Sequence, residues 1–219
     1  MTAQVFTYIG AGGKTTSIFA RARQEREAGR LTAVVTTTHM RRPAAHFQPV
    51  PLRSDWQETW RRSGLIVAGR LAVQGKITWP GDEIYQQLCE KADTVLVEGD
   101  GSKRLPLKVM RPHEPVIPEN CDAVYCLAGL AALGQPAAAA CFHYELLGLN
   151  AADVITEPLF AHIVEAGCLQ RLGPWREKTE VVLNQADDEV LRQAGERILA
   201  RLSRPGGLTS YPKEMREIR

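Results

Sequence analysis

The chain has 219 residues, enough for one large α/β unit with a sizeable core, and 44% of them are hydrophobic. Its 27 Lys and Arg nearly balance its 25 Asp and Glu, and this balance argues against a broadly basic surface for nucleic acid or anionic membranes. A local basic cluster stays open. No apolar stretch reaches the roughly 18 residues that a membrane span needs, and no signal segment opens the chain. We therefore expect a cytoplasmic protein with a single domain over 1–219 and no nucleic-acid or membrane partner.

The five cysteines are an odd number, and no pair has the CxxC or Cys/His spacing of a zinc site. We expect free and mostly buried thiols. Cys121 and Cys126 flank a predicted strand, and they are the pair that we would test for an exception.

The clearest motif is a glycine-rich turn that follows the strand-like run 5–7. Its sequence is Gly10-Ala11-Gly12-Gly13-Lys14-Thr15-Thr16. Backbone N–H groups of such a turn can bind phosphate oxygens, Lys14 can reach the β- and γ-phosphates, and Thr15 can ligate Mg²⁺. The pattern GxxxxGK[ST] is incomplete because its first glycine position is Tyr8. The remaining GxxGKTT resembles the compact phosphate loop of Mur-ligase-type nucleotide-binding proteins.

The rest of the chain alternates strand and helix patterns, which indicates a mostly parallel sheet covered on both faces. We predict strands over 31–36, 65–68, 94–98, 123–128 and 180–183, helices over 17–28, 82–91, 158–166 and 188–202, and an added β-hairpin over 71–79. Thr156 is the predicted N-cap of the third helix, and Gly167 is its predicted stop. The predicted fold class is thus three-layer α/β with P-loop NTPase-like topology.

Ligands of open α/β sheets collect at the carboxyl ends of the strands, where polar residues follow two further strands. Thr37 and His39 follow the second strand and would lie near the phosphate or the attacking nucleophile; an incidental strand end is the equal alternative. Glu98 and Asp100 follow a buried strand and share one face by strand periodicity, so either could hold Mg²⁺ and Asp100 could assist catalysis. A solvated Asp-Gly turn is the alternative there.

A basic, proline-rich segment comes next, with Lys103, Arg104, Lys108 and Arg111. It could bind an acidic substrate or a transferring phosphoryl group, or it could be a solvated loop.

The last strand leads into Asn184-Gln185-Ala186-Asp187, which resembles the NKxD element that reads guanine. In that reading the Asp187 carboxylate accepts from the N–H donors of the base. Gln185 replaces the lysine whose stem packs on the base plane, so ATP and GTP both stay open. A strand-to-helix turn with an N-cap is an equal alternative.

Together, IGAGGKTT, VVTTTH, VLVEGDGSKRLPLK with HEPVIP, LAGLAALGQP and VLNQAD resemble the YqeC family, accessory proteins of selenium-dependent molybdenum hydroxylases. The resemblance covers nearly the whole chain, and EGDGSKRLPLK with HEPVIP is its most specific part. It implies a P-loop nucleotide-binding protein in selenium-cofactor biosynthesis or hydroxylase maturation, with a molybdenum hydroxylase or its cofactor-loading factors as partner. The family's usual NKAD is altered at Gln185.

We interpret the chain as a Mg²⁺-dependent binder of ATP or GTP that hydrolyses or transfers the γ-phosphate. Lys14 would neutralise developing charge on the phosphates. Two alternatives are a non-catalytic nucleotide switch that docks a partner enzyme, and a kinase or ligase acting on a small acidic molecule.

Overall fold

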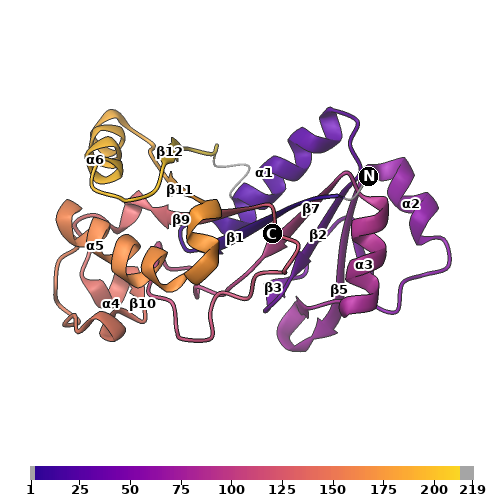
Figure 1. Ribbon diagram of the computed structural model, residues 1–219, viewed down its shortest axis with the longest axis horizontal. Coiled ribbons are helices and arrows are strands. Elements are labelled where there is room, and N and C mark those ends of the chain that lie inside the picture. Colours follow the sequence, from indigo (N-terminus) through magenta and orange to yellow (C-terminus); the bar gives the residue numbers. More distant parts are fainter. Residues whose placement is uncertain (1–2, 213–219) are drawn as a thin grey trace.

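A computed structural model describes residues 3–212 and shows an α/β molecule built on a mostly parallel sheet (Figure 1). The strands run through the middle of the molecule, with α5 and α6 gathered at one end and α2 and α3 at the other. The parallel strands are β1 (Gln4–Gly10), β2 (Thr32–Thr36), β4 (Phe47–Pro49), β5 (Leu65–Ala72), β7 (Thr94–Glu98), β9 (Ala123–Gly129), β11 (Thr179–Asn184) and β12 (Gly206–Thr209).

The main strand order is β12-β11-β9-β1-β7-β2-β5-β6-β3, and β4 pairs with β5 beside that path. Strands β6 (Lys76–Thr78) and β3 (Met40–Arg41) continue the sheet in antiparallel pairing. A separate two-stranded sheet joins β8 (Leu107–Lys108) to β10 (Cys141–Phe142). The carboxyl ends of β1, β2, β7, β9 and β11 therefore lie along one edge, which is where the predicted site residues follow.

Helices cover both faces of the sheet. The side chains of each strand point alternately to the two faces and so join two separate apolar clusters. Val5 and Ile9 of β1 belong to the larger cluster, whereas Phe6 and Tyr8 pack with Ile18 in the smaller one. The smaller cluster contains Ile18 and Ala22 of α1 (Lys14–Glu27). The larger cluster contains residues from α2 (Trp56–Ser63), α3 (Asp82–Lys91), α4 (Ala137–Ala140), α5 (Glu157–Gly167) and α6 (Glu189–Leu199). This arrangement confirms the predicted three-layer α/β class.

Several predicted elements are confirmed with small shifts in their bounds. Helix α3 and strand β7 begin and end where the sequence predicts, and Thr156 caps α5 by accepting from the Leu159 N–H. Helix α5 runs through Gly167 rather than stopping before it, and α6 ends at Leu199. The predicted hairpin is the antiparallel pair of β5 and β6, in which Leu71 lies opposite Ile77.

All five cysteines are free thiols, and four of them are buried. The Sγ of Cys121 lies 3.1 Å from the Thr7 hydroxyl oxygen. Among residues 3–212, no helix is long and apolar enough to cross a membrane.

Candidate nucleotide site

The glycine-rich turn leaves β1 at Gly10 and enters α1 at Lys14, with no residue between the loop and the helix N-terminus. Gly12 and Gly13 have φ angles of 80° and 122°, which side chains rarely tolerate. A Cβ on Gly12 would lie 2.3 Å from the Gly129 backbone nitrogen, and one on Gly13 would lie 2.3 Å from Asn184 Nδ2. The loop is thus packed against the ends of β9 and β11, and only glycine fits at either position.

Lys14 is held inside this loop rather than extended into solvent, and it is only 5% exposed. Its ammonium group donates to the Gly10 carbonyl oxygen and lies 3.0 Å from Asp100 Oδ1. The positive charge is therefore fixed beside the helix N-terminus, which itself favours an anion.

Thr15 and Glu98 form the second part of the site. The Thr15 hydroxyl donates to Glu98 Oε2 at 3.0 Å. Burial raises the pKa of Glu98, against the opposing effects of Lys14 and the Thr15 hydrogen bond. In the described part of the chain, no three His, Cys, Asp or Glu side chains gather in a way that could hold a metal ion. Mg²⁺ prefers oxygen ligands and keeps phosphates and waters in its shell, so Thr15 and Glu98 are a donor set that fits it.

Asp100 occupies a different environment from Glu98. It is fully buried, its Oδ2 accepts from the Gly10 N–H at 3.0 Å, and its two oxygens face the ammonium groups of Lys14 and Lys108. The Asp100 carboxylate therefore interacts with the phosphate loop, through Gly10 and Lys14, and with the segment that carries Lys108. This geometry suits a residue that positions Lys14 better than one that ligates Mg²⁺.

Lys108 is not part of an exposed basic loop, contrary to what its neighbours in the sequence suggest. Its side chain is fully buried, and its Nζ lies 3.0 Å from Asp100 Oδ2, 2.8 Å from Glu114 Oε2 and 2.7 Å from the Gly101 carbonyl oxygen. Burial raises the pKa of Glu114, but the hydrogen bonds from Arg111 and Lys108 outweigh it and lower the pKa to about 2. Lys108 therefore braces the site from behind and does not face a substrate in this arrangement.

Lys103 and Arg104 are exposed, and both have left-handed backbone angles. The turn that carries them is fastened to the phosphate loop, because the Gly12 N–H donates to the Leu105 carbonyl at 3.2 Å. Lys103 lies over the Phe142 ring, with its ammonium 4.9 Å from the ring centroid. These two cations border the loop that would hold the phosphates.

Thr37 connects the end of β2 to two other segments. Its hydroxyl lies 3.3 Å from the Glu98 carbonyl oxygen and 2.9 Å from that of Val116. His39 is exposed. The structure thus places Thr37 next to the Glu98 backbone and leaves His39 at the outer end of the same segment.

At the end of β11, Asn184 braces the phosphate loop. Its Nδ2 donates to the Gly12 carbonyl at 2.8 Å, and its Oδ1 accepts from the Thr209 hydroxyl at 3.1 Å. Asp187 accepts from the Ser210 hydroxyl at 2.6 Å and is exposed. Thr209 and Ser210 were missed from the sequence, because β12 is short and opens with two glycines.

Gln185 points inward rather than over the surface beside Asp187. Its backbone is left-handed at φ 68°, and its Oε1 is buried without a hydrogen-bond partner in the described structure. A Cβ on Gly129 would lie 2.3 Å from that oxygen. The side chain therefore packs beside the phosphate loop.

Comparison with known proteins gives one family and several individual likenesses, among them one curated relative and two solved structures. The family model described as "YqeC protein" matches residues 6–145. The Escherichia coli (strain K12) protein YqeC, described as uncharacterized, is 32% identical over 136 residues, or 59% of this chain and 53% of its own. The chain thus spans about half the length of that curated relative.

Two solved structures are more distant. HypB from Helicobacter pylori, solved in complex with nickel, covers 98% of this chain and 82% of its own, with a TM-score of 0.44 and 12% identity. The match to chloroplast FtsY from Physcomitrella patens covers 100% of this chain and 53% of the FtsY chain, with a TM-score of 0.35 and 13% identity.

Proposed function

The chain belongs to the YqeC family, as its sequence motifs indicate, and we propose that it is a Mg²⁺-dependent purine nucleoside triphosphate-binding protein that hydrolyses the γ-phosphate. The observation that carries this proposal is the joining of the phosphate loop to the β11 end. Asn184 Nδ2 donates to the Gly12 carbonyl, so the strand end that would bind the base is joined to the loop that would bind the phosphates.

Within this site, each side chain has one role. The N–H groups of Gly13, Lys14, Thr15 and Thr16, at the start of α1, bind the phosphate oxygens. Those of Gly10, Ala11 and Gly12 instead hold the loop in shape, because they donate to Asp100, Leu127 and Leu105. Lys14 leaves the Gly10 carbonyl for the β- and γ-phosphates and neutralises their charge in the transition state. Asp100 keeps its contacts with Lys108 and the Gly10 N–H when Lys14 moves.

Mg²⁺, if bound, would be held by Thr15 and Glu98 and would withdraw charge from the phosphates. Their oxygens lie 3.0 Å apart and share one hydrogen bond, which the metal would replace.

GTP is the nucleotide that we favour over ATP. Asp187 offers a carboxylate at the end of β11, held by Ser210. Guanine presents its ring N1–H and its 2-amino group to such a carboxylate, and adenine lacks both of these donors. Gln185 weakens this preference, because its side chain turns inward and leaves the base plane without the cover that a lysine stem would provide.

A nucleotide switch is the second function supported by a specific observation. The Thr37 hydroxyl is already engaged by two carbonyl groups, and exposed His39 lies beyond it, so neither residue is placed as a general base for fast hydrolysis. In this role, triphosphate binding would reshape the Thr37–Val116 contact and alter docking to a molybdenum hydroxylase or its loading factors, the partners implied by the family resemblance. Phosphoryl transfer to a small acid held by Lys103 and Arg104 is the third candidate.

A thermal-shift panel tests the proposal. GTP, ATP, CTP and the matching diphosphates are compared with and without Mg²⁺. A ligand at about 100 times its dissociation constant adds about 2.7 kcal/mol to the free energy of unfolding. We expect GTP with Mg²⁺ to stabilise most; no shift with any nucleotide would contradict binding. Multiple-turnover phosphate release then supports a hydrolase, binding without turnover supports a switch, and product formation that depends on an added acid supports transfer.

A further inference from the structure

A second surface lies beyond the nucleotide site, on the β5–β6–β3 end of the sheet. The sequence from 28 to 54 and from 59 to 81 contains no Asp or Glu. In this part of the chain, Arg41, Arg70 and Lys76 are exposed. The chain therefore has a local basic cluster although its overall charge is nearly balanced. The arrangement of these side chains determines what the cluster can bind.

These three cations share one face of the antiparallel strands. Arg41 lies opposite Lys76, Lys76 lies opposite Ala72, and Ala72 is two residues from Arg70 on β5. Directly opposed residues and residues two apart on a strand point to the same side. The other side carries Met40 and Ile77, which are buried in the smaller core cluster. We call Arg41, Arg70 and Lys76 the basic face.

The basic face is costly to the fold and is not neutralised by it. Arg41 and Lys76 are like charges placed directly opposite each other, a pairing that destabilises a sheet. None of the three forms an ion pair within residues 3–212, whereas some of the arginines on other elements do. Those paired arginines are Arg21, Arg23, Arg30, Arg111, Arg176, Arg192, Arg197 and Arg204. An anionic partner would supply the missing counter-charge.

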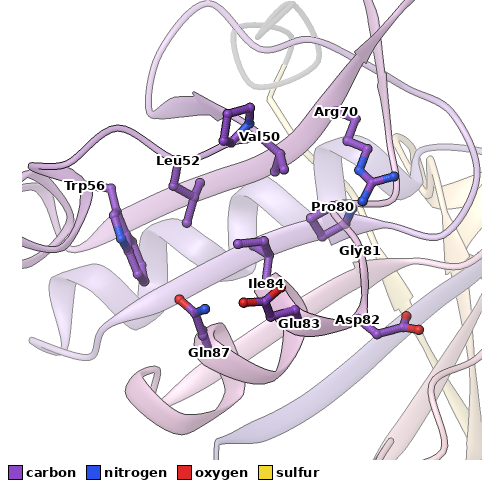
Figure 2. A pocket seen from close by; sticks show the side chains of 11 residues that line it. Val50, Leu52, Trp56, Arg70, Pro80, Gly81, Asp82, Glu83, Ile84 and Gln87 are labelled. Carbon is purple, nitrogen blue, oxygen red and sulfur yellow. The ribbon is translucent and has the colours of Figure 1, made fainter.

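A cavity of about 460 Å³ adjoins this face, and Arg70 forms part of its lining. Figure 2 shows Arg70 at one end of the cavity and Trp56 at the other. Val50, Leu52 and Ile84 supply apolar walls between them. Such a volume is typical of ligand sites and accommodates large apolar side chains.

The charges around the cavity restrict what can bind there and how it is oriented. Asp82 and Glu83, in the first turn of α3, line the cavity too, and Asp82 accepts from the Trp79 indole N–H at 2.9 Å. A phosphate backbone would meet these carboxylates, and Trp56, only 8% exposed, offers little face for base stacking. A peptide can bury an apolar side chain in the cavity and direct its carboxylates only toward the strands.

We propose that the cavity and the basic face form a docking site for an acidic segment of a partner protein. The segment anchors a bulky apolar side chain between Leu52 and Ile84 and places flanking carboxylates on Arg70, Lys76 and Arg41. This site is independent of nucleotide binding.

The test is selection of a displayed random-peptide library on the immobilised full chain, followed by titration of the enriched peptides in solution. We expect a consensus with one large apolar residue and at least two acidic neighbours. Its affinity should fall more than tenfold with Arg70→Glu or Ile84→Glu and should weaken as salt rises. Arg201→Glu is the matched control, since Arg201 is exposed beyond α6, and it should leave the affinity unchanged.

Lys76→Glu separates docking from folding. It puts opposite charges on the Arg41–Lys76 pair, so thermal stability should hold or rise while peptide affinity falls. No enriched peptide, a consensus without acids or without an apolar residue, or binding that ignores Arg70→Glu and Lys76→Glu would overturn the proposal. Equal or tighter binding of duplex DNA or phosphatidylglycerol vesicles through the same residues would overturn it too.

Discussion

Replacement of Lys108 by methionine is the sharpest test of how the site is braced. Methionine keeps an unbranched side chain of similar bulk and removes the charge. Asp100 and Glu114 would then each keep a single cation, Lys14 and Arg111. Removing one partner of a buried ion pair costs about 3–5 kcal/mol, because the remaining charge stays desolvated. With about 2–4 °C per kcal/mol for a chain of this size, the midpoint of thermal unfolding should fall by about 6–20 °C.

Urea denaturation followed by circular dichroism measures the loss. Arg23→Met is the control, since the Arg23–Glu27 ion pair is exposed on α1 and should change the free energy of unfolding by less than about 1 kcal/mol. The double variant Lys108→Met with Asp100→Asn should be more stable than Lys108→Met alone, because it removes the carboxylate left behind. A Lys108→Met protein within about 1 kcal/mol of the parent would refute the claim that this network supports the fold.

Three further predictions concern single carboxylates. Glu98→Gln should weaken triphosphate binding in the presence of Mg²⁺ and leave metal-free binding unchanged, whereas Asp100→Asn should weaken both; isothermal titration with and without Mg²⁺ would show identical losses if this division of roles is wrong. Asp187→Asn should move preference from GTP toward XTP, with a change of roughly ten- to a hundredfold for one charge-assisted bond, and unchanged competition among GTP, ATP, ITP and XTP would mean that the base is not bound there. Because the pKa of Glu114 falls from 4.5 to about 2 on folding, its stabilisation is complete above pH 4.5 and is lost as the pH falls toward 2. The parent should therefore lose up to about 3 kcal/mol more than Glu114→Gln across that range in acid titrations of stability, and parallel curves would contradict the assignment.

The sequence predicts the framework because its strands are short apolar runs with clear ends. Thr94–Glu98 and Asp82–Lys91 have the bounds that the pattern indicates, and the Thr156 cap lies where expected. Helix α2 was missed because its only buried residues, Trp56 and Trp60, lie one turn apart in a polar segment of eight. Periodicity over so short a length is weak.

The partners of the charged residues could not be predicted, because they depend on contacts between distant segments. Lys108 reads as one more cation in a basic loop, yet strand β8 carries it inward to Asp100 and Glu114. Likewise, Thr209 and Ser210 gain meaning only when β12 lies beside β11, where Thr209 aligns with Asn184.

The most direct test of nucleotide binding is isothermal titration of the parent and of Lys14→Ala with GTP and Mg²⁺. Asp100 keeps Lys108 and the Gly10 N–H in this variant, so it should stay folded, as circular dichroism would verify. We expect the parent to bind and the variant to lose at least tenfold in affinity, since a hydrogen bond to a charged group contributes about 1.5–3 kcal/mol. Equal affinity in the two proteins, or no binding by the parent, would contradict the assignment of Gly10–Thr16 as a phosphate loop.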